Sequence, residues 1–241
     1  LLSKVGVLSY WPAGYPILLF LMAKISISHI MWVISIVQSA FYGYASYYFT
    51  KELMVTKLKP YLFMISFILA INPTLSLSSL AVGYESPVAA CMLMVLGLIV
   101  KSELNAIDKR FWIRVAGVGA FLALATFMQP RWILTTLVIA LVWALIHKNS
   151  KKVAALILIG VMAIMAIAPA SLIYRNVKAG NGAVISTNLG VTMRIGAGDQ
   201  TSGGYNHTGP EVPCDPVAPA TTVTDNQVVK CVINWYASHP T

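Results

Sequence analysis

The sequence predicts an all-α polytopic membrane protein with about six transmembrane helices, a short re-entrant helix and a loop-rich α/β tail on the outer face. Of its 241 residues, 58% are hydrophobic and only 10% are charged, whereas soluble domains carry about 25% charged residues. The lysines and arginines also gather in short clusters between long apolar runs. A change in composition near residue 175 predicts two parts: a partial transmembrane helical domain (1–174) and an extracytoplasmic segment (175–241) rich in glycine and proline.

The expected helices follow one another with short connections. An aromatic, proline-rich segment at 10–16 leads into the apolar piece 17–22, which is too short to cross a bilayer because a span takes about 20 residues. This piece predicts a re-entrant or interfacial helix. The first full span is expected at 30–49, and 61–71 predicts a helix that is broken by the Asn-Pro pair following it. The remaining spans are expected at 87–100, 112–128, 132–146 and 153–174.

The positions of the charges predict the orientation in the membrane. There are 17 basic residues against 8 acidic ones, but the basic residues form no continuous face, so nucleic-acid binding is not expected. Ten of the 17 lie in three loops, which are cytoplasmic by the positive-inside rule. These ten are Lys51, Lys57, Lys59, Lys101, Lys109, Arg110, Arg114, Lys148, Lys151 and Lys152. This orientation places Glu85, the turn 129–131 and the tail from Arg175 onward on the outer face.

The outer tail is expected to contain turns, one strand and one helix. The Asn-Gly pair at 181–182 is a strong turn signal, residues 183–187 are typical of a short strand, and 227–238 fit an amphipathic helix. Cys214 and Cys231 both fall on the outer side, where oxidation is permitted. The sequence leaves open whether they form a disulfide.

Glu85 is the most prominent candidate for a functional residue. It lies just before the span that begins at Pro87, where the free N–H groups and the dipole of a helix N-terminus favour an anion. An ionisable residue at the edge of a membrane span is a functional candidate by default. The alternative is an interfacial acid that only ends a span, and position alone does not decide between the two.

The other candidates are polar or aromatic residues that the predicted topology brings to the same outer face. They are Trp11, Tyr15, Gln129, Arg131, Arg175, Asn188, Arg194 and Asp199. Arginine forms paired hydrogen bonds to phosphate oxygens, and a carboxylate acts as a base or holds a divalent metal ion. Glu85 among several arginines therefore suits a substrate that carries a phosphate beside a group that loses a proton. For each arginine, contact with lipid head groups is the alternative interpretation.

Motifs for common cofactors and nucleophiles are absent from the sequence. There is no zinc-ligand set, P-loop, dinucleotide fingerprint or nucleophile elbow. The four histidines are scattered without partners at motif spacing, so none is expected to be catalytic. A divalent metal ion at Glu85 is the one cofactor that the sequence leaves under consideration.

Taken in chain order, several short segments resemble the GT-C class of polytopic glycosyltransferases, in particular the branch with protein O-mannosyltransferases and lipid A aminoarabinose transferase. The segments are Trp11-Pro-Ala-Gly-Tyr-Pro16, Asn72-Pro73, Gly83-Tyr-Glu85-Ser-Pro87, Met128-Gln129-Pro130-Arg131, Arg175-Asn176, and Ile185-Ser-Thr-Asn-Leu-Gly190 with the glycines up to Gly204. At Gln129 this chain departs from the family, in which arginine is usual at that position. The order and spacing of these segments cover nearly all of the chain.

The resemblance implies a hexosyl- or pentosyltransferase in the plasma membrane of a bacterium, with its active-site cavity on the outer side. It implies a polyprenyl-phosphate sugar as donor and a lipid or protein as acceptor, alongside contacts with membrane lipids. Glu85 would assist the acceptor or bind a metal, and Arg131, Arg175 and Arg194 would be candidates for the donor phosphate. Such enzymes carry their main acidic residue in the first outer loop and further helices at the C-terminal end, so the chain is expected to be a fragment that continues at both ends.

Two other functions remain open at this stage. A transporter or flippase for a lipid-linked anion would use the broken helix at Asn72-Pro73 as part of its site, although no inverted repeat is evident. An inactive remnant or assembly subunit is the third interpretation. Consumption of a lipid-linked donor separates an enzyme from a transporter, which only moves the donor.

Overall fold

A computed structural model describes residues 12–72, 78–80, 83–198, 212–215 and 222–239. The chain divides into two compact units, a larger one at Ala13–Pro169 and a smaller one whose C-terminal part is Ala170–Thr241. The described residues form helices and loops and contain no strand.

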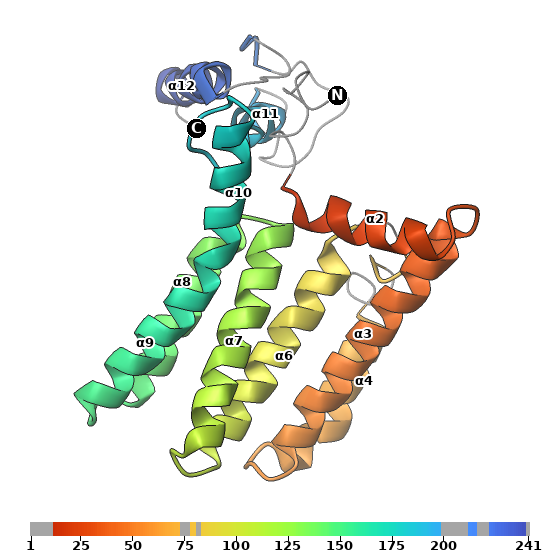
Figure 1. The fold of residues 1–241 in the computed structure, drawn as a ribbon, viewed down its shortest axis with the longest axis vertical. Helices are drawn as coiled ribbons and strands as arrows, with labels where there is room; N and C mark the ends of the chain where they lie inside the picture. Colours follow the sequence, from red (N-terminus) through yellow and green to blue (C-terminus); the bar gives the residue numbers. More distant parts are fainter. Residues whose placement is uncertain (1–11, 73–77, 81–82, 199–211, 216–221, 240–241) are drawn as a thin grey trace. The chain divides into compact units, whose positions relative to one another are not determined.

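The larger unit is a bundle of helices (Figure 1). In chain order its elements are α2 (Gly14–Ile25), α3 (Ile30–Leu53), the 3-10 turn η1 (Lys59–Tyr61), α4 (Leu62–Ile71), α6 (Glu85–Glu103), α7 (Lys109–Met128), α8 (Trp132–Ile146) and α9 (Lys151–Met165). The connections after α3, α6 and α8 lie at one end of the bundle, and these are the three basic loops, so we call it the Lys-rich end. The opposite end, where α7 finishes and α6 and α8 begin, is called the Glu85 end.

The largest buried cluster of the larger unit lies between α6, α7, α8 and α9, and a second one joins α3 to α6. The largest buried side chains of the first cluster are those of Phe111 and Trp143. Helices α7 and α9 approach closely at Gly119, because a Cβ atom there would lie 2.9 Å from Cβ of Ile164. Large apolar side chains also cover the outside of the unit, and Phe63 of α4 is 82% exposed. An apolar exterior around a packed core is what a protein surrounded by lipid tails requires.

Among the described residues, three helices are long and apolar enough to cross a membrane: α6, α7 and the 28-residue stretch Lys151–Lys178, which comprises α9 and α10 (Ile167–Lys178). The number rises to four if α2 and α3, bent by 117° at their junction, count as one span. Helix α4 with its preceding turn, and helix α8, are shorter apolar helices. The fold is therefore a helical one with three to four candidate spans, and the expected six remain a proposal.

Helix α2 occupies the position where the sequence predicts a short re-entrant or interfacial helix. It contains 12 residues and extends beyond the expected segment at positions 17–22, but it is still too short to span a membrane. Its first residue must be glycine, since a Cβ at Gly14 would lie 2.5 Å from the carbonyl oxygen of Phe127. This close approach fixes the start of α2 against the last turn of α7, at the Glu85 end.

The described part of the smaller unit contains helices and no strand, which corrects the expected α/β tail. It contains α10, the short α11 (Leu189–Ile195) and α12 (Thr222–Ser238). The strand expected at 183–187 is not formed, because the Asn176 side-chain amide donates to the carbonyls of Val184 (2.7 Å) and Ile185 (3.0 Å). Backbone groups that would pair with a neighbouring strand are thus bound by one side chain.

A disulfide joins the loop before α12 to α12 itself. It links Cys214 to Cys231, with the Cα atoms 5.8 Å apart, so the pairing that the sequence left open is present in the structure. Close by, Gly190 lets α11 contact α12, since a Cβ there would lie 2.8 Å from Cβ of Val228. The disulfide and this contact hold the small core of the unit together.

Candidate functional site

The broken helix expected after residue 71 is stabilised from α3. In an α-helix the carbonyl of Leu69 would accept a hydrogen bond from the N–H of residue 73, but residue 73 is a proline and has none. The hydroxyl of Tyr42 donates to this carbonyl instead, at 2.8 Å. A carbonyl left unpaired within an apolar bundle would be costly, so the Tyr42 hydroxyl helps α4 to end at Ile71.

The same face of α3 holds the irregular backbone that leads into α6. The Ser35 hydroxyl donates to the carbonyl of Leu80 at 2.9 Å, and the Gln38 amide donates to the carbonyl of Gly83 at 3.3 Å and to the Tyr15 hydroxyl at 2.8 Å. Ser35, Gln38 and Tyr42 are three and four residues apart and therefore lie along one side of the helix. This polar row positions the residues directly before Glu85.

Glu85 is the first residue of α6, and its side chain is exposed. A Cβ atom on Gly83 would collide with the Glu85 carboxylate oxygen Oε2, so the glycine makes room for the acid. Pro87 is buried in the first turn, where its missing N–H has no helical partner to lose. Within the described part of the chain, Glu85 forms no hydrogen bond and no ion pair.

Gln129 and Tyr84 orient the guanidinium group of Arg131. Because a guanidinium only donates hydrogen bonds, the Gln129 amide is placed with its oxygen toward it. That oxygen then accepts from Nε and Nη2 of Arg131, at 2.7 and 2.6 Å, and from the Tyr84 hydroxyl at 2.9 Å. Arg131 Nη2 also lies 3.3 Å from the Tyr84 hydroxyl oxygen. Gln129 is buried, so Arg131 is held from one side and remains open to a ligand on the other.

Glu85 and Arg131 both line a cavity of about 480 Å³ at the Glu85 end, a volume typical of small-molecule sites. The lining residues are Tyr84, Glu85, Val88, Ala89, Met92, Leu93, Gln129, Arg131 and Trp132. The polar residues gather at the start of α6 and the α7–α8 turn, and the apolar ones continue along successive turns of α6. The acid and the guanidinium form no ion pair with each other. The cavity can therefore accept a ligand with a charged head and an apolar chain.

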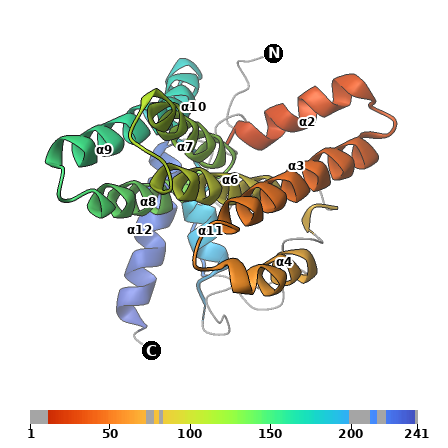
Figure 2. The same cartoon turned by 90° about the horizontal axis from the view of Figure 1, so that it is seen from below.

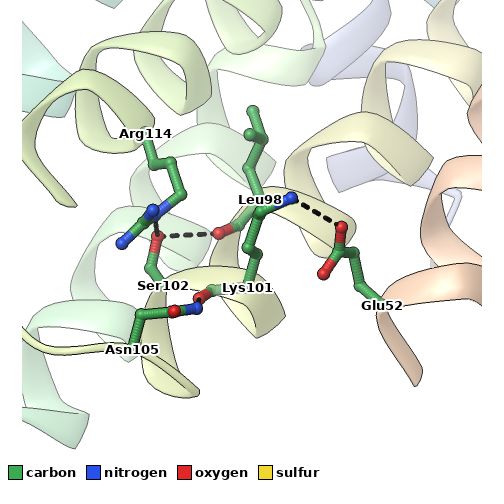
Figure 3. Close-up of polar contacts among 6 residues, drawn as sticks. All are labelled: Glu52, Leu98, Lys101, Ser102, Asn105 and Arg114. Carbon is green, nitrogen blue, oxygen red and sulfur yellow. Dashed lines mark hydrogen bonds and ion pairs between the residues drawn. The ribbon is translucent and has the colours of Figure 1, made fainter. Parts of the chain in front are cut away.

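The charged residues at the Lys-rich end are arranged differently (Figure 3). Lys101 Nζ lies 2.9 Å from Oε1 of Glu52, which is buried. Arg114 Nε donates to the Ser102 hydroxyl at 3.1 Å, and that hydroxyl donates to the carbonyl of Leu98 at 2.7 Å. These contacts join the ends of α3, α6 and α7.

The other two acids at the Lys-rich end also have structural partners. Oε1 of Glu103 accepts from the Trp143 ring N–H at 2.7 Å and lies 3.0 Å from Nε2 of His147. Asp108 caps α7 by accepting from the N–H of Phe111 at 2.9 Å, and this N–H holds the pKa of Asp108 below its ordinary value. Of the four acids in the described part of the larger unit, Glu85 alone lacks a partner.

The predicted site residues fall into three groups. Glu85, Gln129 and Arg131 line the cavity, and Tyr15 contacts the polar row of α3 that supports it. Three further candidates belong to the smaller unit, and Trp11 and Asp199 lie outside the described residues. The three are Arg175, Asn188 and Arg194.

The three candidates of the smaller unit make contacts within it. Arg175 Nε donates to Oδ1 of the neighbouring Asn176 at 2.8 Å, Asn188 Oδ1 accepts from the Ser186 hydroxyl at 2.9 Å, and Arg194 is buried. Asp225 also acts within this unit, because its carboxylate accepts from the N–H of Gly190 at 2.8 Å. Burial raises the pKa of Asp225.

Sequence reasoning missed Tyr84, Trp132 and the polar row of α3. A signal for the row was present, since Ser35, Gln38 and Tyr42 share one face of an otherwise largely apolar helix. Nothing in the sequence identified the carbonyls to which they donate.

A metal ion at Glu85 would need ligands from elsewhere. Glu85 is the only acid that lines the cavity, and within the described ranges no three His, Cys, Asp or Glu side chains gather as a metal site. A divalent ion there would take its remaining oxygens from water or from a phosphate of the ligand.

Comparison with protein-family models, with curated proteins and with solved structures finds no match to this chain. The function proposed for it therefore depends on the cavity itself.

Proposed function

We propose that the protein is a membrane glycosyltransferase that moves a sugar from a polyprenyl-phosphate donor to a lipid or protein acceptor. The observation that carries the proposal is that Glu85, the one acid in the described part of the larger unit without a structural partner there, lines the same cavity as an oriented Arg131. The two groups have opposite charge and do not neutralise each other. Arg131 would bind the phosphate of the donor, and Glu85 would act on the hydroxyl of the acceptor.

In the proposed reaction Arg131 binds the donor phosphate, and the first isoprene units lie along the apolar wall of α6. The acceptor oxygen attacks the anomeric carbon from the face opposite the phosphate, which gives inversion. The bond between that carbon and the phosphate oxygen breaks, and polyprenyl phosphate leaves with its charge beside Arg131. Glu85 takes the proton of the acceptor hydroxyl as general base. The GT-C class, which the sequence resembles, uses donors of this kind.

The proposal includes the orientation of the protein in a bacterial plasma membrane. The basic loops that gather at the Lys-rich end would be cytoplasmic, which would put the cavity at the outer surface. The disulfide between Cys214 and Cys231 is consistent with an outer location for the smaller unit, because disulfides persist in oxidising compartments. With α4 and α8 included, the chain would cross the membrane six times.

A transporter for a lipid-linked anion is the second candidate function. The specific observation in its favour is the broken helix α4, whose open carbonyl is bound by Tyr42 of α3. Irregular backbone that is held by a neighbouring helix is also a feature of transport sites. A transporter would use Arg131 for the anion but would leave the sugar–phosphate bond intact.

The two functions are separated by following one labelled donor. The protein is placed in vesicles with a set of polyprenyl-phosphate hexoses and pentoses that are radiolabelled in the sugar, and chromatography measures cleavage while a membrane-impermeant reagent measures crossing. Protein-dependent cleavage of a donor, with transfer of its sugar, supports the glycosyltransferase. Movement of intact donors without cleavage overturns it in favour of the transporter. If donors are neither cleaved nor moved, both functions are wrong and an assembly role becomes the better explanation.

A further inference from the structure

Helix α4 lies beside α3 (Figure 2). A second cavity is lined by residues of α3, of α4 and of the segment that follows α4. Its volume is about 470 Å³, and it shares no lining residue with the cavity at Glu85. It is lined by Ser39, Tyr42, Gly43, Ser46, Tyr47, Thr50, Ser66, Leu69, Ala70 and Ser79. Seven of these ten side chains carry a hydroxyl and none carries a charge. We call this cavity the hydroxyl groove.

Several hydroxyls of the groove already have partners. Ser39 donates to the Ser79 hydroxyl at 3.1 Å, and Thr50 donates to the carbonyl of Ser46 at 2.8 Å. Such contacts are the ordinary way in which serine and threonine are satisfied in an apolar helix. These contacts satisfy part of the hydroxyls that line the groove, and other hydroxyls of the lining have no such partner.

Three hydroxyls of the groove have no hydrogen-bond partner among the described residues. Ser46 Oγ is shielded from solvent and meets no acceptor or donor with hydrogen-bond geometry, although the Tyr42 hydroxyl lies near it. The hydroxyls of Tyr47 and Ser66 line the groove and make no hydrogen bond to other described residues. A hydrocarbon chain in the groove would leave these groups unsatisfied, which is costly in lipid. The natural occupant is therefore polar.

The surroundings of the groove indicate how that occupant enters. From Ser39 to Thr50 the groove follows about 16 Å of α3, at 1.5 Å per residue, and it ends near the Lys-rich end. The flanking side chains of Tyr44, Phe63 and Phe67 are more than half exposed, as residues in contact with lipid would be. The groove would thus be reached from the lipid leaflet on the Lys-rich side.

We propose that the hydroxyl groove binds the neutral, hydroxylated headgroup of a membrane lipid, such as a single sugar on diacylglycerol. Hydroxyls both donate and accept, so they match the hydroxyls of a sugar. A phosphate headgroup would find no arginine or lysine in the lining, and the acyl chains of the lipid would remain in the bilayer beside α4. The proposal does not depend on a transfer reaction at Glu85.

The test is photocrosslinking of the protein in nanodiscs to monoglucosyl-diacylglycerol that carries a photoreactive group on the sugar. We expect label on peptides from 39–50 and 62–71, removed by excess unlabelled monoglucosyl-diacylglycerol and not by phosphatidylglycerol or phosphatidylcholine. Equal competition by all three lipids would show general lipid contact only. Absence of label in these peptides would indicate a groove filled with water. Either result overturns the proposal.

Gly43 offers a variant that fills the groove without disturbing the packing, because a Cβ there meets no atom within 4 Å. Gly43→Leu should weaken specific labelling by about tenfold, and Ser46→Ala should weaken it less, as expected for the loss of one hydrogen bond. Phe63→Leu, on the exposed face of α4, is the matched control and should label like wild type. Unchanged labelling in Gly43→Leu, with a melting temperature equal to that of wild type, also overturns the proposal.

Discussion

The acidic residues at the two ends of the larger unit differ in whether they have structural partners. At the Lys-rich end, Glu52 pairs with Lys101, Glu103 accepts from Trp143, and Asp108 caps α7. Each acid there joins or terminates helices. At the opposite end, the carboxylate of Glu85 has no partner among the described residues.

This difference separates charges that serve the fold from charges that are available to a ligand. A polar group that is already satisfied gains little from a ligand, because binding would exchange one partner for another. Arg131 shows an intermediate arrangement, since it is oriented by a neutral amide and not neutralised by an acid. The Glu85 end therefore combines a free negative charge and an oriented positive charge, and the variants below test whether that combination has a function.

The largest expected effect comes from exchanging the acid at one end and then at the other. Glu85→Gln should lower sugar transfer by about 10²- to 10⁴-fold, the range for loss of a general base, and should change the melting temperature little, because Glu85 makes no hydrogen bond or ion pair to another described residue. Glu52→Gln should do the reverse: it should retain transfer and destabilise the fold by about 1 kcal/mol, since it breaks a partly exposed ion pair. Transfer assays and thermal unfolding measure the two effects. Full activity in Glu85→Gln would remove the functional distinction between the ends.

A smaller effect is expected from displacing Glu85 without removing it. In Gly83→Ala the new Cβ collides with Oε2 of Glu85, and the carboxylate, as the end of a flexible side chain, would rotate away. We expect transfer to fall by about 10- to 100-fold, as for other small misplacements of a catalytic group, with little change in the melting temperature. Gly117→Ala in α7 is the control, because its Cβ contacts only a Leu98 side chain. An active Gly83→Ala would show that the position of the carboxylate is unimportant.

Part of the candidate site could be predicted from the sequence because alternating helices return to the same end. Glu85 opens one helix and Gln129 closes the next, so a simple count of crossings places both at one end of the bundle. The role of Gln129 was harder to predict from the sequence. Its oxygen binds Arg131 two residues later, a local contact that depends on the turn geometry at Pro130.

The remaining features depend on contacts between distant parts of the chain. Gln38 and Gly83 are 45 residues apart, and the acceptor is a backbone carbonyl, which every residue possesses. The strand expected at 183–187 was wrong for a similar reason: β-branched residues favour strands only weakly, and Asn176 supplies the donors that a neighbouring strand would have given. The six expected spans stay a prediction, because α4 and α8 are short although their sequences are apolar.

The next effect concerns the orientation of Arg131. Gln129→Leu removes the acceptor for both guanidinium nitrogens, so Arg131 should become mobile and the KM for the donor should rise by about tenfold, with a smaller change in kcat. Tyr84→Phe removes only the hydroxyl contact and should have a weaker effect in the same direction. Donor titrations of both variants provide the measurement. A lower kcat at unchanged KM would mean that Gln129 acts on the reaction and not on donor binding.

The smallest effect is expected at the Lys-rich end, from the pH dependence of the Asp108 cap. The Phe111 N–H lowers the pKa of this carboxyl in the folded protein, so the ionised form is favoured by folding. Its contribution to stability is present above the pKa of the unfolded chain and is lost as the pH falls through the lower, folded value. Asp108→Asn keeps a good capping side chain but no longer titrates, so its stability should decline less steeply than that of wild type between about pH 5 and pH 2. Unfolding in denaturant at a series of pH values gives the two slopes.

Asp108→Asn also tests whether the two ends are independent. Since Asp108 is bound to a backbone N–H and lies far along the bundle from Glu85, this variant should leave the transfer rate near pH 7 unchanged. A reduced rate would mean that the two ends are not independent.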